Sequence, residues 1–113
     1  MTARQPNRPA QKVVIDRFVV PRGSRASFVE ASGTVQNILK GVPGFVEGYV
    51  YETSNENGDC LFATTVVWKD EGAFELAKEL VAQKLRELGL NTAEKMRELN
   101  VQIDRGVYER TPF

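Results

Sequence analysis

The sequence predicts an α+β domain in which a four-stranded antiparallel sheet carries its helices on one face. Four segments rich in β-branched and aromatic residues alternate with amphipathic helical segments in the order β-α-β-β-α-α-β. An Asn-Gly pair at positions 57 and 58 separates the second and third strands and is typical of a tight antiparallel hairpin. A strand–helix–strand crossover combined with a central hairpin is the ferredoxin-like arrangement.

The first strand is expected over residues 12–20, where apolar side chains dominate both faces. Pro21 ends this strand because proline lacks the amide hydrogen that a strand ladder needs. Ser24 is expected to cap the first helix, and Gly41 to end it. The apolar positions of this helix recur at spacings of three and four residues and form one stripe: Phe28, Ala31, Val35, Ile38 and Leu39.

The second and third strands are expected over residues 45–53 and 61–68. Strict alternation along the second strand places Phe45, Tyr49 and Tyr51 on one face. The third strand holds large or β-branched groups on both faces and no charge. A strand of this kind is covered on both sides, because a half-solvated strand alternates apolar with polar residues.

The second helix should begin after Asp70, whose side chain can cap the first turn, and should end near Gly89. Asn91 and Glu94 have the spacing of a capping box and predict a short third helix to about residue 100. The last strand is then expected over residues 101–109.

The helices can cover only one face of this sheet, and the other face is also largely apolar. Left bare, it would exceed the few hundred Å² of apolar patch that a monomer usually exposes. Burying about 800 Å² per partner offers on the order of 15–20 kcal/mol, before an association cost of about 4–15 kcal/mol. The sequence therefore predicts a homodimer through the sheet faces, that is, a dimeric α+β barrel.

The composition argues against several classes of function. Fifteen basic residues balance fifteen acidic ones, which argues against a nucleic-acid partner. No apolar run is long enough to cross a membrane, and no secretory signal is visible, so we expect a cytoplasmic protein. The single cysteine excludes an internal disulfide and a cysteine-cluster metal site. Residues 1–11 are expected to be a flexible tail, and residues 12–113 a single domain.

The chain contains no histidine, so the commonest metal and haem ligand and the usual proton-transfer group near neutral pH are missing. Any acid–base step must use another side chain or the acidity of the substrate itself. We therefore expect no metal site, and no catalytic residue can be assigned from the sequence.

Over residues 12–110 the chain resembles the antibiotic biosynthesis monooxygenase family of dimeric α+β barrels. The resemblance rests on the turn at residues 21–23, on the Val-Pro-Gly-Phe segment at residues 42–45, and on the run from Val67 to Phe74. That run has a tryptophan at the end of the strand and an Ala-Phe pair at the start of the helix. The Val-Tyr-Glu segment at residues 107–109 resembles the last strand of the family.

The resemblance implies a cofactor-independent monooxygenase acting on a small phenol- or quinol-type aromatic compound, with no cofactor. The haem-degrading branch uses a histidine to bind iron, and this chain has none. A phenolic substrate can ionise and pass an electron to oxygen, so the protein need only bind, orient and desolvate it. The alternatives are a non-catalytic dimeric barrel that binds a small ligand and, with less support, isomerase or lyase chemistry.

Three aromatic residues are candidate ligand contacts. The resemblance implies that Trp68 lines a pocket between sheet and helices, and the alternative is a core tryptophan. Tyr49 and Tyr51 share one face of the second strand. They could donate hydrogen bonds to a phenolate, or they could fill the interior of a barrel.

Three polar residues are the remaining candidates. Asp16 and Arg17 are adjacent in the first strand and therefore point to opposite faces, so one of them must point toward the helices or the barrel interior. The alternatives are an ion pair with Asp104 or Arg105 of the last strand, or binding of an acidic or phenolic ligand. Asn37 of the first helix either faces the pocket or is a solvent-exposed amide.

Overall fold

The computed structural model describes residues 10–113 and has the predicted order of elements. The predicted flexible tail over residues 1–11 lies almost entirely outside the described residues. The elements are β1 (Lys12–Val20), the 3-10 helix η1 (Arg22–Ser24), α1 (Arg25–Lys40), β2 (Phe45–Ser54), β3 (Cys60–Trp68), α2 (Glu71–Glu87), α3 (Thr92–Glu98) and β4 (Gln102–Glu109).

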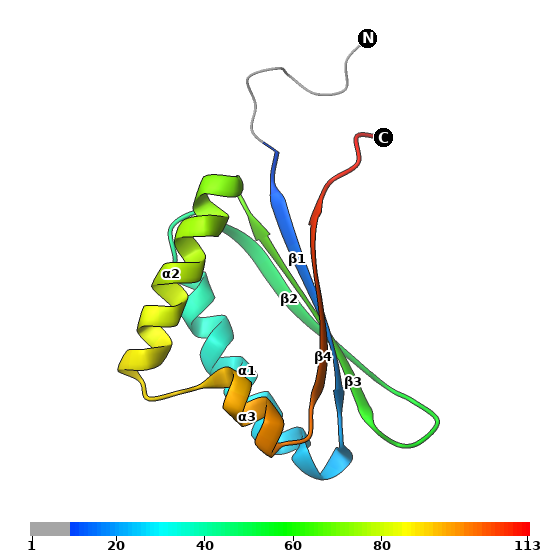
Figure 1. Ribbon diagram of the computed structural model, residues 1–113. Coiled ribbons are helices and arrows are strands. Elements are labelled where there is room, and N and C mark those ends of the chain that lie inside the picture. Colours follow the sequence, from blue (N-terminus) through cyan, green and yellow to red (C-terminus); the bar gives the residue numbers. More distant parts are fainter. Residues whose placement is uncertain (1–9) are drawn as a thin grey trace.

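The four strands form one antiparallel sheet in the order β2-β3-β1-β4. Figure 1 shows α1, α2 and α3 on one side of this twisted sheet, so the sheet has a helix-facing side and a helix-free side. The predicted ferredoxin-like α+β fold is confirmed. Strand β3 lies between β2 and β1, in the interior of the sheet, which explains why it carries apolar side chains on both faces.

Two of the three predicted N-caps are present. The Asp70 carboxylate accepts a hydrogen bond from the amide of Ala73 at 2.8 Å, and Asn91 accepts one from the amide of Glu94 at 3.0 Å. The prediction for Ser24 is wrong, because its hydroxyl donates to the carbonyl oxygen of Leu99 at 2.9 Å. The 3-10 turn η1 has already placed the backbone of Ser24 in the helical region, whereas a capping residue normally has an extended backbone.

Strand β2 contains a β-bulge between Phe45 and Glu47. The extra residue shifts the alternation, so Phe45 packs edge-on against Trp68 on the helix-facing side, with ring centroids 5.9 Å apart. Tyr49 and Tyr51 follow the bulge and lie on the helix-free side. The predicted common face of Phe45 and the two tyrosines is therefore wrong, because a bulge inverts the side on which later residues point.

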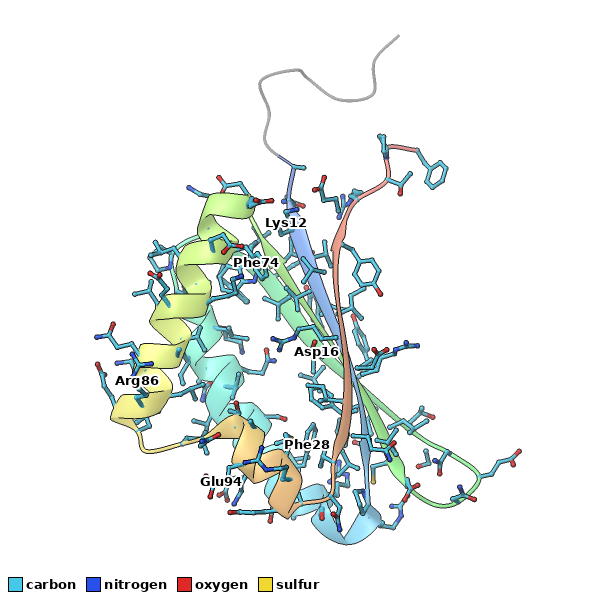
Figure 2. All side chains as sticks on the ribbon, viewed as in Figure 1. Lys12, Asp16, Phe28, Phe74, Arg86 and Glu94 are labelled. Carbon is cyan, nitrogen blue, oxygen red and sulfur yellow. The ribbon has the colours of Figure 1, made fainter. Side chains whose placement is uncertain are left out.

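The core between sheet and helices consists of two apolar clusters. The first cluster surrounds Trp68 and includes Val14, Val42, Val66 and Ala77. The second cluster surrounds Phe28 and includes Val20, Cys60 and Phe62. Figure 2 shows Phe74 of the first cluster and Phe28 of the second at opposite ends of the helix layer, with Asp16 at a level between them.

The helices do not cover the whole helix-facing side. Ile103 and Val107 of the edge strand β4 lie opposite Phe18 and Val14, respectively, and so share their face. Nevertheless Ile103 is 51% exposed and Val107 is 47% exposed. The helix-facing side of β4 is therefore open to solvent, directly beside the core.

Candidate functional site

One row of polar residues crosses the helix-facing side of the sheet between the two apolar clusters. Thr64 of β3 and Arg105 of β4 are the cross-strand partners of Asp16 on β1, so the three side chains share one face. Asp16 and Thr64 are both buried. The rows on either side of them are apolar on β1 and β3: Val14 with Val66, and Phe18 with Phe62.

The Asp16 carboxylate is held by both arms of one guanidinium. Nε of Arg105 donates to Oδ1 at 2.7 Å, and Nη2 donates to Oδ2 at 2.7 Å. This bidentate geometry is the strongest form of an arginine–carboxylate pair. The hydrogen bond to Asp16 raises the pKa of Arg105 above its ordinary value. The buried carboxylate is therefore compensated, as a charge in this position must be.

The exposure of the two partners is very unequal. The side chain of Asp16 is 9% exposed, whereas that of Arg105 is 62% exposed. Asp16 lies on an interior strand, and Arg105 lies on the edge strand. Arg105 therefore stands between the buried carboxylate and the solvent at the margin that the helices leave open.

Arg17 points to the helix-free side and pairs with Asp104 of β4 at 2.5 Å. The expectation that the mid-strand charges pair with the last strand is thus confirmed for both residues, with Asp16 to Arg105 and Arg17 to Asp104. Both side chains of the Arg17–Asp104 pair are exposed to solvent, whereas in the Asp16–Arg105 pair the carboxylate is buried. The hydrogen bond with Asp104 raises the pKa of Arg17.

A hollow of about 620 Å³ lies on the helix-free side and crosses all four strands. Tyr51 lines it together with Arg17, Leu61 and Ala63, and Tyr49 lies next to Tyr51 along the same strand. Both tyrosines are exposed. They are separated by the sheet from Asp16 and Trp68, so the structure does not bring the predicted aromatic and acidic candidates into one site.

Trp68 is buried in the first apolar cluster, where it contacts the edge of Phe45. Its surroundings agree with the core alternative for this residue. Asn37 is exposed and lines a groove of about 630 Å³ between α1 and α2, together with Ile38 and Leu80. The exposure of Asn37 agrees with the solvent-exposed alternative for this amide.

Two residues of the polar row were not site candidates in the sequence. Thr64 is the one hydroxyl residue among the helix-facing positions of β3, which are otherwise Cys60, Phe62, Val66 and Trp68. That interruption of an apolar series was a visible signal. Arg105 was foreseen only as an ion-pair partner, because its position beside the opening depends on where the helices end.

Among residues 10–113, no group of three or more histidine, cysteine or acidic side chains is arranged to hold a metal ion. Within the same described range, none of the helices has the length and apolar character required to cross a membrane.

No family model and no curated protein sequence matches this chain. Solved structures do match it. SnoaB, a cofactor-independent oxygenase from Streptomyces nogalater, is 19% identical, with 91% of this chain and 95% of that chain covered and a TM-score of 0.67. A Shewanella loihica PV-4 protein proposed to be a monooxygenase is 17% identical, with 92% and 97% covered and a TM-score of 0.66.

A dimeric ferredoxin-like protein from an uncultured marine organism is 9% identical, with 90% of this chain and 96% of that chain covered and a TM-score of 0.69. At these identities the likeness is one of fold, and a fold by itself hosts many activities. The chain therefore has the fold used by a cofactor-independent oxygenase, and its activity has to be argued from its own side chains.

Proposed function

We propose that this protein is a cofactor-independent monooxygenase that oxidises a small phenol- or quinol-type aromatic compound. The observation that carries the proposal is the buried Asp16 carboxylate paired with the exposed Arg105, between two apolar clusters at the open margin of the helix-facing side. The use of the same fold by SnoaB supports the proposal. The aromatic ring would lie against the apolar rows, and the hydroxyl group against the polar row.

This oxidation requires few functional groups from the protein. In the oxidation of an anthrone, a methylene carbon loses two hydrogens and gains one oxygen atom, and the second oxygen atom leaves as water. The substrate supplies the electrons, so the protein has to bind the ring, favour its ionised form and exclude water. A buried carboxylate with its guanidinium partner, beside apolar side chains, offers the polar contacts for these tasks.

We also propose that the active form is a homodimer in which a second copy covers the helix-free side. Large apolar side chains on that side are exposed in the single chain, among them Tyr49, Tyr51 and Tyr108. The centre of the same side is apolar, with Ile15, Leu61 and Ala63 on the two interior strands. A self-complementary pairing of two such faces follows the usual two-fold symmetry of homodimers.

Oxygen consumption with a panel of anthrones and hydroquinones tests the proposed activity. We expect uptake with at least one compound, and at least a tenfold lower rate for Asp16→Asn, because a neutral amide cannot accept the substrate's proton as a carboxylate can. Glu52→Gln is the matched control, since Glu52 forms a similar two-armed pair with Arg25 at the other edge of the sheet. Binding of the panel compounds without oxygen uptake would favour the non-catalytic, ligand-binding alternative.

A further inference from the structure

The Asp16–Arg105 pair joins a buried carboxylate to an exposed guanidinium. We propose that Arg105 is a displaceable cover over Asp16. An aromatic ligand with an ionisable hydroxyl enters over β4, moves Arg105 toward the solvent, and gives its hydroxyl proton to Asp16. This inference rests on the proposed function for the class of ligand, and it adds a route of access and a proton acceptor to it.

The position of Arg105 allows its side chain to be displaced. It lies on an edge strand, more than half of its side chain is exposed, and the two hydrogen bonds that its guanidinium makes with the described residues both go to Asp16. Its neighbours on the same face, Ile103 and Val107, are half exposed. When the guanidinium leaves Asp16 it can exchange these two bonds for bonds with water, and its departure opens an apolar strip along β4.

The position of Asp16 keeps its carboxylate inside the protein. It lies on β1 between β3 and β4, and its side chain is almost completely buried. Apart from Arg105, its helix-facing neighbours on adjacent strands are the hydroxyl of Thr64 and apolar side chains. The carboxylate therefore cannot follow the guanidinium into solvent.

The helix residues that pack in the two clusters on either side of this position are apolar. Helix α1 contributes Phe28 and Ile38, α2 contributes Phe74, Ala77 and Val81, and α3 contributes Met96. The nearest other cation on the same face of β1 is Lys12, which is bound to Glu71 and Glu109. When the guanidinium is displaced, the hydroxyl of the ligand takes its place as the donor to this carboxylate.

The proposed step is a proton transfer without oxidation or reduction. The O–H bond of the ligand breaks, and a new O–H bond forms on one carboxylate oxygen of Asp16. The electron pair stays on the ligand oxygen and produces the electron-rich phenolate that can react with oxygen. Thr64 lies directly opposite Asp16 on β3.

Binding of 4-nitrophenol and of its methyl ether, 4-nitroanisole, tests the proposal without any turnover. The absorbance of 4-nitrophenol reports its ionisation, and stopped-flow mixing gives the association rate. We expect Arg105→Gln to raise the association rate of both compounds about tenfold, because no ion pair has to break first. We expect Asp16→Asn to abolish the phenolate signal that wild-type protein induces in 4-nitrophenol at a pH where the free compound is neutral.

Arg25→Gln is the control, since it opens the comparable Arg25–Glu52 pair at the far edge of the sheet and should change neither readout. If Arg105→Gln does not fold, Arg105→Lys should give an intermediate rate, because an ammonium cannot span both carboxylate oxygens. An unchanged association rate in the Arg105 variants, or an unchanged phenolate signal in Asp16→Asn, overturns the proposal.

The proposed function and the cover can fail separately. Oxygen uptake by the wild type, together with unchanged association rates in the Arg105 variants, would support the oxygenase activity and overturn the proposed role of Arg105 as a cover. If the association rates change as expected but no compound of the panel causes oxygen uptake, the role of Arg105 as a cover is supported and the oxygenase activity is overturned. If wild-type protein binds neither nitro compound, the cover is overturned, and the anthrone panel still decides the activity.

Discussion

Asp16 and Arg17 are neighbours in the chain, yet the sheet gives their charges different surroundings. Arg17 and Asp104 form a pair whose side chains are 72% and 69% exposed, whereas the carboxylate of Asp16 is buried under Arg105. Exposed pairs contribute at most about 1 kcal/mol, because water and salt screen them and both side chains lose freedom. A carboxylate left buried without its cation is far more costly.

We therefore expect Arg105→Ala to lower the free energy of unfolding by about 2 kcal/mol, and Arg17→Ala to lower it clearly less. The first figure is below that of a fully buried pair because the guanidinium of Arg105 is itself largely exposed. Urea unfolding of the two variants beside the wild type measures both values. Equal effects would show that Asp16 is hydrated when Arg105 is absent.

Glu52 gives a pH-dependent prediction at the same scale. The hydrogen bond from Arg25 lowers the pKa of Glu52 below its ordinary value of 4.5. A lowered pKa in the folded state means that this pair stabilises the protein above pH 4.5 and ceases to do so as the pH falls through the folded-state value. We expect the wild type to be more stable than Glu52→Gln at neutral pH, with the difference shrinking below pH 4.5. Thermal unfolding across this range measures the difference, and a difference that grows toward acid would contradict the assignment.

At the scale of elements, the junction of β2 with α2 depends on one glycine. Gly44 has a φ of +88°, which side chains other than glycine rarely adopt, and its carbonyl oxygen accepts a hydrogen bond from the amide of Lys69. A Cβ at this position would lie 2.4 Å from the Cβ of Ala73 in the first turn of α2. The close approach of the turn to the helix is what holds the two elements together here.

Gly44→Ala should therefore lower the free energy of unfolding by more than about 2 kcal/mol, since both the backbone strain and the clash act. Gly58→Ala in the β2–β3 hairpin is the matched control. Gly58 has a similar φ of +84°, but a Cβ there would meet nothing within 4 Å. We expect only the backbone cost of about 1–2 kcal/mol for Gly58→Ala, and chemical denaturation distinguishes the two. Equal losses would mean that α2 shifts to admit the extra methyl group.

At the scale of the whole molecule, the proposed homodimer depends on the helix-free side. It presents the exposed rings of Tyr49, Tyr51 and Tyr108 around the apolar centre of the sheet, with a hollow at one end. The open margin over β4 lies on the opposite side of the sheet. A second copy on the helix-free side would therefore leave the Asp16–Arg105 pair accessible to a ligand.

Light scattering at micromolar concentration tests the dimer, and we expect the mass of two chains. Leu61→Glu places a charge in the hollow of the helix-free side and should reduce the mass to that of one chain, because an unpaired charge would be buried in the interface. Leu76→Glu is the control, since Leu76 is 47% exposed on α2. A wild-type mass of one chain would refute the homodimer.

The order of elements was predictable because it depends on signals that lie close together in the chain. Examples are the period of the apolar residues in α1, the caps at Asp70 and Asn91, and the Asn-Gly hairpin between β2 and β3. The bulge in β2 was not predicted from the alternation of side chains, although Gly48 directly follows it, and it placed Phe45 on the face of Trp68.

The same distinction between local and long-range signals applies to the candidate site. The sequence by itself determined that Asp16 and Arg17 point to opposite faces and that each needs a partner, because neighbours in a strand always diverge. Only the tertiary structure decided that Asp16 is the buried one and that Arg105 covers it. The reason is that the face of a strand, its register with β4 and the edge where the helices stop are set by packing between segments far apart in the chain.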